Sequence, residues 1–281
     1  ANLLEKIFQE SKNNSQPIEI VIHFAGYKSV SDSCKKPLEY WSNNLIGTIN
    51  LLNIMEKFNC KNFIFSSSAS VYGNKYESPL KEHYKLNPTS PYAKTKASIE
   101  KLLEDIQKGS NKWRIVILRY FNPIGAHPSG LIGENPKNKP ENIFPYLCQV
   151  ASGLRKKLYV FGNDWPTSDG TCHRDYIHIL DLAEIHKKTL KFLLDNGGTN
   201  LIFNVGKGKS YSVLELINAF ETVNNIKINY EFTTRRDGDI AISYADTSKI
   251  YNILKWKPSK SIEDMCKDGW NWQKKLVSEQ K

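Results

Sequence analysis

The sequence predicts an α/β fold in which helices cover a parallel sheet, followed by a smaller region of mixed strands and helices. Three observations carry this expectation. Short apolar runs alternate with longer helical stretches through roughly the first 120 residues. A segment rich in Gly, Pro and Asn then interrupts the alternation after Asn122. Hydrophobic residues make up 40% and charged residues 24% of the 281 residues, an ordinary globular composition.

The expected elements of the first part are a strand at residues 18–25, a helix at about 38–58, a strand at 61–67, an amphipathic helix at 90–107 and a strand at 114–120. Strands and helices that alternate at this spacing are typical of parallel strands joined by helical crossovers. Beyond the interruption we expect strands near 158–161 and 201–205 and a helix at 213–224.

Composition excludes several classes of protein. The longest apolar runs are far too short to span a bilayer, and polar residues interrupt the N-terminus where a signal peptide would be apolar. The five cysteines form no C-x-x-C pair, which favours a reducing compartment. The net charge is +10, but 33 lysines are spread along the chain and only 6 residues are arginine. We therefore expect a cytoplasmic protein with neither a nucleic-acid nor a membrane partner.

Ligands of open α/β sheets bind outside the carboxyl ends of the strands. At the three expected strand ends the sequence reads Ala25-Gly26, Ser66-Ser67-Ser68 and Phe121-Asn122. Small or polar residues there leave room and hydrogen-bonding groups for a ligand.

The sharpest local signal is YAKTK at residues 92–96. Tyr92 and Lys96 share one face of a helix, and Pro91 favours a helix that begins there. A phenol has a pKa of about 10 and is a poor base at neutral pH, but a nearby ammonium favours the phenolate. Tyr92 is therefore a candidate acid/base, and Ser68 can hydrogen-bond the same substrate oxygen. The alternative is a chance spacing on a helix surface.

Six ordered motifs extend this signal over residues 18–273. They are HFAGYKSV (23–30), FSSSASVYG (65–73), PYAKTK (91–96), RYFNPIGAHPSGLIGE (119–134), FGNDWPTSDGTCHRDYIHILDLAEIH (161–186) and RRDGD (235–239). With these motifs the chain resembles the extended short-chain dehydrogenase/reductase family, and specifically its UDP-glucose (UDP-galactose) 4-epimerase branch.

The resemblance implies a Rossmann-like, doubly wound parallel sheet with a smaller mixed α/β substrate domain. Residues 1–122 would form an incomplete NAD-binding domain and residues 123–281 mainly a UDP-sugar-binding domain, with some segments returning to the first. The implied activity is NAD-dependent epimerisation at C4 of a UDP-hexose in galactose metabolism, by a homodimer. Tyr92 would take the 4-hydroxyl proton while hydride passes from C4 to NAD and later returns to the other face of the 4-keto sugar. Lys96 would hold the cofactor ribose and lower the pKa of Tyr92.

The resemblance also assigns roles to individual residues. The catalytic set is Ser68, Tyr92 and Lys96. The residues expected to bind the cofactor are Phe24, Ala25, Gly26, Lys28, Asn43, Ser66, Tyr92, Lys96, Tyr120 and Phe121. The residues expected to bind the UDP-sugar are Lys28, Ser68, Tyr92, Asn122, Asn142, Ile143, Tyr159, Val160, Phe161, Arg174, Arg236, Asp239 and Ser243. Two arginines suit a pyrophosphate, because guanidinium groups make charge-assisted, bidentate contacts to phosphate.

Two features depart from that family. No G-x-G-x-x-G occurs, since Gly206-Lys207-Gly208 lacks a third glycine, and the resemblance implies that on the order of 60 residues are absent. The strand at 18–25 would then be an apolar edge, and NAD would lack a helix N-terminus for its pyrophosphate. The hypothesis is a truncated piece of a complete enzyme, with an inactive fragment or a non-catalytic nucleotide-sugar-binding protein as alternatives. The second departure is Ser243, which stands where a large tyrosine excludes N-acetylated sugars, so UDP-GalNAc and UDP-GlcNAc are further expected substrates.

Two other kinds of site are less well supported. Cys172, His173 and His178 resemble a metal cluster, but no carboxylate pair or C-x-x-C accompanies them, so we expect no metal. A nucleotide-sugar 4,6-dehydratase needs an acidic pair directly after the serine position. Ala69 and Ser70 stand there and cannot act as acids.

Overall fold

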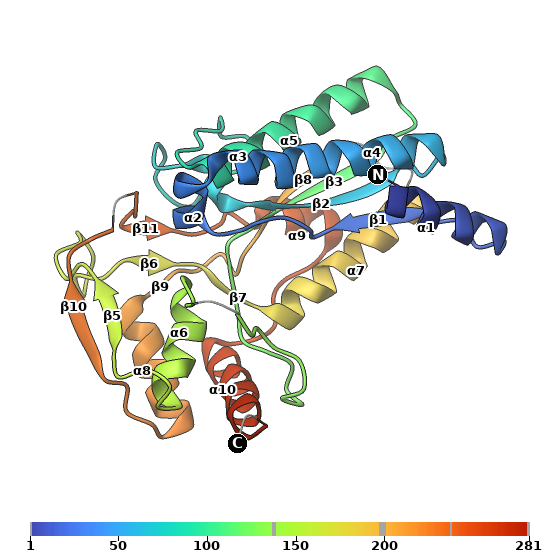
Figure 1. Ribbon diagram of the computed structural model, residues 1–281. Coiled ribbons are helices and arrows are strands. Elements are labelled where there is room, and N and C mark those ends of the chain that lie inside the picture. The colour runs from blue at the N-terminus through green and yellow to red at the C-terminus, as the bar shows by residue number, and fades with distance from the viewer. Residues whose placement is uncertain (1, 137–138, 197–200, 237, 280–281) are drawn as a thin grey trace. The chain divides into compact units, whose positions relative to one another are not determined.

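The computed structural model of the protein describes residues 2–136, 139–196, 201–236 and 238–279. The chain divides into two compact units (Figure 1). Unit 1 comprises Ala1–Tyr76, Glu82–Tyr120 and His186–Asn204, and unit 2 comprises Glu77–Lys81, Phe121–Ile185 and Val205–Lys281.

Unit 1 is built on a sheet of β1 (Ile20–His23), β2 (Asn62–Ser68), β3 (Arg114–Tyr120) and β8 (Leu201–Val205), in the order β1-β2-β3-β8. β2 runs parallel to both β1 and β3, which confirms the predicted parallel sheet. β1 is shorter than the segment predicted at 18–25. β2 extends one residue further than predicted, because Ser68 still pairs with Tyr120.

Helices cover both faces of this sheet. Those of unit 1 are α1 (Asn2–Asn13), α2 (Val30–Lys35), α3 (Pro37–Tyr40), α4 (Gly47–Lys57), α5 (Pro91–Gly109) and the second half of α7 (Ile179–Asn196). Figure 1 shows α4 and α5 on one face and α7 on the other. Alternate strand residues such as Phe63 and Ile115 pack with Met55 of α4 and Leu103 of α5, and all four side chains are fully buried. The apolar side chains of the helices and those of alternate strand residues thus pack together on one face of the sheet.

The helix predicted at 38–58 is not one regular α-helix. A π-helix, Trp41–Ile46, separates α3 from α4. Within it the Asn44 side chain is buried, accepts a hydrogen bond from the Tyr27 amide (2.8 Å) and donates one to Thr95 Oγ1 (3.1 Å). Such π-turns are rare, are invisible to a 3.6-residue periodicity and often occur at functional sites.

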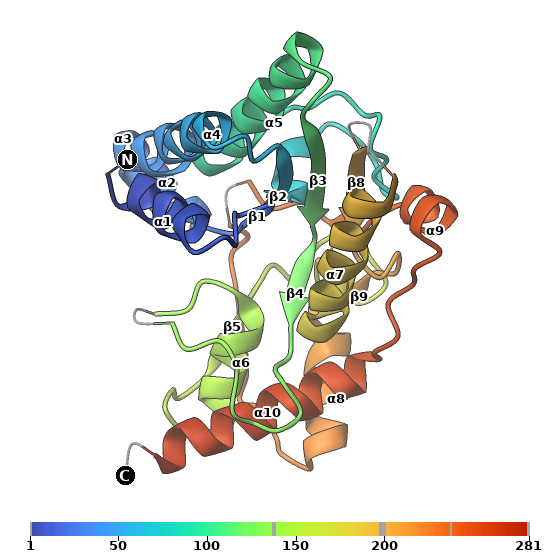
Figure 2. The ribbon, with the colours of Figure 1, turned by 90° about the vertical axis from the view of Figure 1, so that its right-hand side faces the viewer.

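Unit 2 combines short strands and helices. Its elements are β4 (Asn122–Ile124), α6 (Ile143–Ala151), β5 (Leu158–Phe161), β6 (His173–Arg174), β7 (Tyr176–His178), β9 (Tyr211–Ser212), α8 (Val213–Asn224), β10 (Tyr230–Thr233), β11 (Ile242–Ser243), α9 (Ser248–Leu254) and α10 (Ile262–Ser278). β5 pairs with β10, β4 with β7, and β6 with both β11 and β9, the last antiparallel. Helix α10 packs against α8 and α6 (Figure 2) around a core that includes Phe144, Leu216 and Met265.

No helix in the described parts of the chain is long and apolar enough to cross a membrane. Even α5, the longest of them, is amphipathic. It buries Ile99 and Leu103 and exposes Lys101 and Lys108.

Candidate active site

The C-terminal end of β2 meets the first turns of α5 within unit 1. Ser90 caps α5, since its hydroxyl accepts a hydrogen bond from the Ala93 amide (3.2 Å), and Pro91 follows in the first turn. The helix therefore begins just before Tyr92, as predicted. This start places Tyr92 and Lys96 on successive turns of one helix face.

Lys96 is 5% exposed and donates a hydrogen bond from Nζ to the Ser66 carbonyl oxygen (2.8 Å). The ammonium also lies 4.8 Å from the centre of the Phe65 ring. Burial lowers the pKa of Lys96 to about 8, and the negative charge of Glu100, one turn further along α5, opposes that shift. Burial thus brings the pKa of Lys96 close to neutral pH.

Tyr92 is hydrogen-bonded to the Ser68 side chain. Burial raises the pKa of Tyr92 above its ordinary value, and the hydrogen bond with Ser68 opposes this increase only in part. The expectation that Lys96 lowers the pKa of Tyr92 is wrong in this structure, because desolvation is the largest effect on the phenol and the ammonium is bound to Ser66.

The Ser68 hydroxyl is fixed by the turn that follows β2. It accepts hydrogen bonds from the amide (3.2 Å) and the hydroxyl (3.0 Å) of Ser70 in a short 3-10 helix, Ala69–Tyr72. Ala69 and Ser70 thus stand where a dehydratase needs acids, and the Ser70 hydroxyl instead orients Ser68. Neither can supply a proton as a carboxylic acid does.

The loop after β1 carries four of the residues expected at the cofactor or substrate. Phe24, Ala25, Gly26 and Lys28 are exposed, with Phe24 at 59%. A Cβ on Gly26 would lie 3.2 Å from Asn44 Oδ1 and 3.7 Å from Lys96 Nζ, so the bare backbone passes close to the lysine. Asn43 is exposed beside the buried Asn44. An exposed loop beside a cation suits a phosphate- and ribose-bearing cofactor.

Tyr120, at the end of β3, belongs to a chain of hydrogen bonds in unit 1. Its hydroxyl is 2.7 Å from Ser66 Oγ and 2.5 Å from His186 Nε2 of α7, whose ring lies 4.8 Å from that of Phe24. Burial raises the pKa of Tyr120, so this phenol stays protonated and can donate. The next residue, Phe121, is buried in unit 2 and donates its amide to the Val205 carbonyl oxygen.

In unit 2 the structure brings four of the predicted substrate residues together. The Asp239 carboxylate accepts hydrogen bonds from Arg174 (3.3 Å) and from Arg236 Nε (3.0 Å). Arg174 also donates to the carbonyl oxygens of His173 and Ile240, and the Arg236 guanidinium lies 4.6 Å from the centre of the Phe161 ring. Two guanidinium groups are therefore oriented around one carboxylate, an arrangement with excess positive charge that suits a polyphosphate.

The other predicted substrate residues occupy defined positions in unit 2. Ser243 of β11 pairs with Arg174 of β6. Asn122 opens β4 and is half-buried, Asn142 is exposed at the N-cap of α6 and Ile143 is the first residue of that helix. On β5 the side chains alternate, with Tyr159 at 39% and Val160 at 1% exposed. Val160 can therefore meet a ligand only through its backbone.

Several residues of the site region were missed by the sequence reasoning. The sequence reasoning selected Asn43 and missed its neighbour Asn44, because the π-helix changes which of the two side chains is buried. Glu100 and Arg119 form a buried ion pair, and the signal for it was a charge at each of two positions where the patterns call for apolar residues. Asp175 is fully buried and accepts the amides of Lys207, Gly208 and Ala245, and burial raises its pKa to about 6.

The structure does not gather Cys172, His173 and His178 into a metal site among the described residues. His178 is bonded to Asp268 (3.2 Å), and Cys172 is a buried free thiol. Among the residues whose positions are described, no group of three or more His, Cys, Asp or Glu side chains could hold a metal ion.

The shifted pKa of Lys96 predicts a dependence of stability on pH. The pKa falls from 10.5 to about 8 on folding, so between these values the unfolded chain binds the proton that the folded chain lacks. The free energy of unfolding of the wild type should therefore rise between pH 8 and pH 10 relative to that of Lys96→Met, by at most about 1.4 kcal/mol per pH unit. Denaturant titrations at several pH values measure the difference. A difference that is flat or falls with pH would contradict the burial of a neutralised lysine.

Comparisons with known proteins place this geometry in a family. The family model described as GDP-mannose 4,6 dehydratase matches residues 1–269. A UDP-glucose 4-epimerase of Bacillus subtilis is 48% identical over 278 residues, which is 99% of this chain and 82% of that protein. UDP-glucose 4-epimerase 2 of Arabidopsis thaliana is 48% identical, over 96% of this chain and 75% of its own length.

Solved structures agree with the curated relatives. The UDP-glucose-4-epimerase of Stenotrophomonas maltophila, with bound NAD and formylated UDP-arabinopyranose, matches with a TM-score of 0.94 at 43% identity, over 99% of this chain and 81% of that one. The enzyme of Bifidobacterium longum, in complex with NAD+ and UDP, matches with a TM-score of 0.90 at 44% identity, over 97% of this chain and 81% of that one. The predicted fold class is thereby confirmed. With the motifs, the geometry of α5 and β2 and these relatives in agreement, the chain belongs to the UDP-glucose 4-epimerase family.

Proposed function

We propose that this protein interconverts UDP-galactose and UDP-glucose by NAD-dependent epimerisation at C4. The observation that carries the proposal is the gathering of Ser68, Tyr92 and Lys96 at the junction of β2 and α5. Curated relatives at 45–48% identity are named for this reaction. The alternative of a non-catalytic nucleotide-sugar-binding protein is not favoured, because this catalytic set is complete and hydrogen-bonded.

Tyr92 is the acid/base and acts on the 4-hydroxyl of the sugar. Because burial raises its pKa, the phenol is protonated at neutral pH unless positive charge is near it. The hydrogen bond between Ser68 and Tyr92 favours the phenolate and opposes the effect of burial. Ser68 also shares the substrate oxygen, so it steadies the developing negative charge on that oxygen.

The cofactor would be held by residues of the loop after β1, the π-helix, the first turns of α5 and the ends of β2 and β3. These are Phe24, Ala25, Gly26, Lys28, Asn43, Ser66, Tyr92, Lys96, Tyr120 and Phe121. When bound, NAD supplies the hydride acceptor and the positive charge of its oxidised ring. The open backbone at Gly26 and the nearby ammonium of Lys96 support this assignment. Tyr120, held by Ser66 and His186, offers a fixed phenol rather than a mobile one.

The UDP-sugar would be held chiefly by unit 2. Arg174 and Arg236 bind the pyrophosphate, with Asp239 holding both guanidinium groups before the ligand arrives. The Phe161 ring packs against the Arg236 guanidinium. The other unit 2 residues of the set are Asn122, Asn142, Ile143, Tyr159, Val160 and Ser243. In this assignment unit 1 supplies most of the NAD-binding residues and unit 2 most of the UDP-sugar-binding residues. We further propose a cytoplasmic homodimer that serves galactose metabolism, for which the family resemblance is the support.

Turnover in the presence of UDP-galactose and NAD tests the catalytic assignment. Replacing Tyr92 by Phe removes the acid/base and should lower kcat by about 100- to 10,000-fold, as for loss of other general acid–base groups. Tyr251→Phe is the matched control, because Tyr251 is 42% exposed on α9, and it should retain wild-type activity. Formation of UDP-glucose is followed by a coupled dehydrogenase assay. Undiminished turnover by a folded Tyr92→Phe variant would refute the assignment of Tyr92.

The small side chain at residue 243 predicts that N-acetylated sugars are accepted as well. Ser243→Tyr should lower kcat/KM for UDP-GalNAc by roughly tenfold or more while leaving that for UDP-galactose within about threefold, because only the larger sugar meets the added ring. Both substrates are assayed side by side on both proteins. If the wild type does not turn over UDP-GalNAc, or if the substitution changes both substrates equally, residue 243 does not set this specificity.

A further inference from the structure

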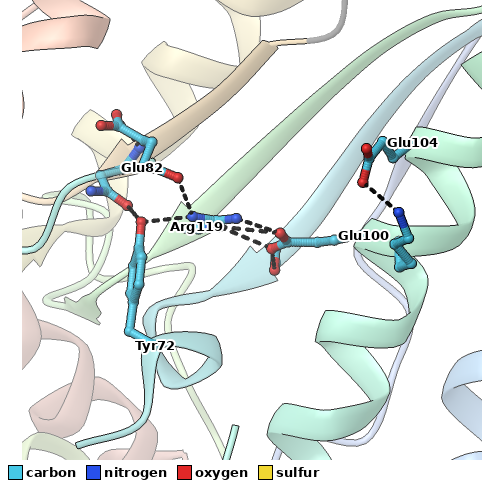
Figure 3. A network of polar contacts seen from close by, with 8 residues as sticks. Tyr72, Glu82, Glu100, Glu104 and Arg119 are labelled. Atoms are coloured by element: carbon cyan, nitrogen blue, oxygen red, sulfur yellow. Dashed lines mark hydrogen bonds and ion pairs between the residues drawn. The ribbon is translucent and has the colours of Figure 1, made fainter. Parts of the chain in front are cut away.

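A buried ion pair between Glu100 and Arg119 joins α5 to β3. Glu100 of α5 is 4% and Arg119 of β3 is 3% exposed. Arg119 Nη2 donates to Glu100 Oε2 (2.6 Å) and Arg119 Nε donates to Glu100 Oε1 (3.1 Å). The guanidinium therefore binds the carboxylate through two nitrogen atoms. Figure 3 shows Arg119 lying between Glu100 on one side and Tyr72 on the other.

The remaining polar groups of this pair are also satisfied. Arg119 Nη1 donates to the Tyr72 hydroxyl (2.8 Å) and to the Glu82 carbonyl oxygen (3.1 Å), and Tyr72 donates in turn to Asn204 Oδ1 (2.6 Å) (Figure 3). The Ser67 hydroxyl donates to the Glu100 carboxylate. The network therefore ties together α5, β2, β3, β8 and the 3-10 helix after β2, all within unit 1.

Three members of the network lie close in the chain to a site residue. Glu100 follows Lys96 by one helical turn, Ser67 precedes Ser68, and Arg119 precedes Tyr120. Three consecutive serines of β2 consequently meet three successive turns of α5: Ser66 meets Lys96, Ser67 meets Glu100, and Ser68 meets Tyr92. A slip or rotation of α5 breaks all three contacts together.

Stability alone does not account for the pair. Desolvation of two buried charges offsets much of their attraction, and apolar pairs of similar volume are often equally stable at such positions. What a bidentate pair adds is a single allowed geometry, since the planar fork of Arg119 accepts Glu100 in one orientation.

We propose that Glu100 and Arg119 are positioning residues that fix the rotation and height of α5 against β2, and so hold Tyr92 at Ser68 and Lys96 at Ser66. Neither side chain touches the reacting atoms. Both act through the serines of β2 and the first turns of α5.

The test compares three variants of the whole protein. Glu100→Gln/Arg119→Met removes both charges and keeps an acceptor for Ser67. Arg119→Lys keeps the charge and loses the fork. Glu104→Gln is the matched control, because Glu104 lies one turn further along α5 (Figure 3) and is partly exposed. It pairs with Lys101 and Lys108 of the same helix. The readouts are kcat and KM for UDP-galactose, the thermal midpoint, and amide hydrogen exchange over residues 92–100.

The proposal expects the double variant to keep its thermal midpoint and KM while kcat falls by about 100-fold, the size of effect that a displacement of about 1 Å produces. Exchange over the first turns of α5 should accelerate, Arg119→Lys should show a smaller loss of kcat, and Glu104→Gln should match the wild type. A folded double variant with kcat within twofold of wild type would overturn the proposal. If the double variant does not fold, wild-type kcat and exchange in Arg119→Lys would overturn it instead.

The kinetic readout rests on the proposed epimerase activity, whereas the exchange readout does not. Absence of turnover in the wild type and in Glu104→Gln alike would count against the proposed function. Unchanged exchange in a folded double variant would count against the positioning role whether or not the protein turns over its substrate.

Discussion

The packing of α5 against the serine end of β2 is the constraint on which the rest of the site depends. One helix carries Tyr92, Lys96 and Glu100 on successive turns, and one strand presents Ser66, Ser67 and Ser68 to them. Because all of these groups are polar and mostly buried, each must be paired. The hydrogen bonds that satisfy them are the same ones that set the distance from phenol to ammonium to hydroxyl. Stability and catalytic geometry therefore share one set of contacts.

The two units organise charge in different ways. In unit 1 burial lowers the pKa of Lys96 to about 8, and its ammonium donates a hydrogen bond to the Ser66 carbonyl oxygen. In unit 2 the two arginines Arg174 and Arg236 lie nearer to the surface and are held by one shared carboxylate, Asp239. The first arrangement suits a group whose protonation matters to chemistry, and the second suits binding of an anion with fixed geometry. This contrast agrees with the division of labour proposed for the units.

The fold was largely predictable from the sequence, because the strands at 61–67 and 114–120 and the helix at 90–107 carry strong periodic patterns and a capped start. Helical spacing alone also predicts that Tyr92 and Lys96 share one face of α5, whereas their catalytic role stays a prediction. The π-helix at Trp41–Ile46 was not predictable, because its wide turn is set by the inward Asn44 rather than by periodicity. Nor was the raised pKa of Tyr92, since it depends on burial and on the electrostatic effect of Tyr40, a residue distant in sequence. The partnership of Glu100 with Arg119 likewise arises only when helix and strand are packed.

The central claim is that hydride leaves C4 of the sugar and returns to the same carbon within one turnover, with Tyr92 moving the proton. Incubation of the protein and NAD with UDP-galactose deuterated at C4, followed by NMR of the UDP-glucose formed, measures this most directly. The account predicts that the deuterium is retained at C4 of the product and that none exchanges with water. Loss of the label to solvent, or conversion without any involvement of the C4 hydrogen, would contradict it.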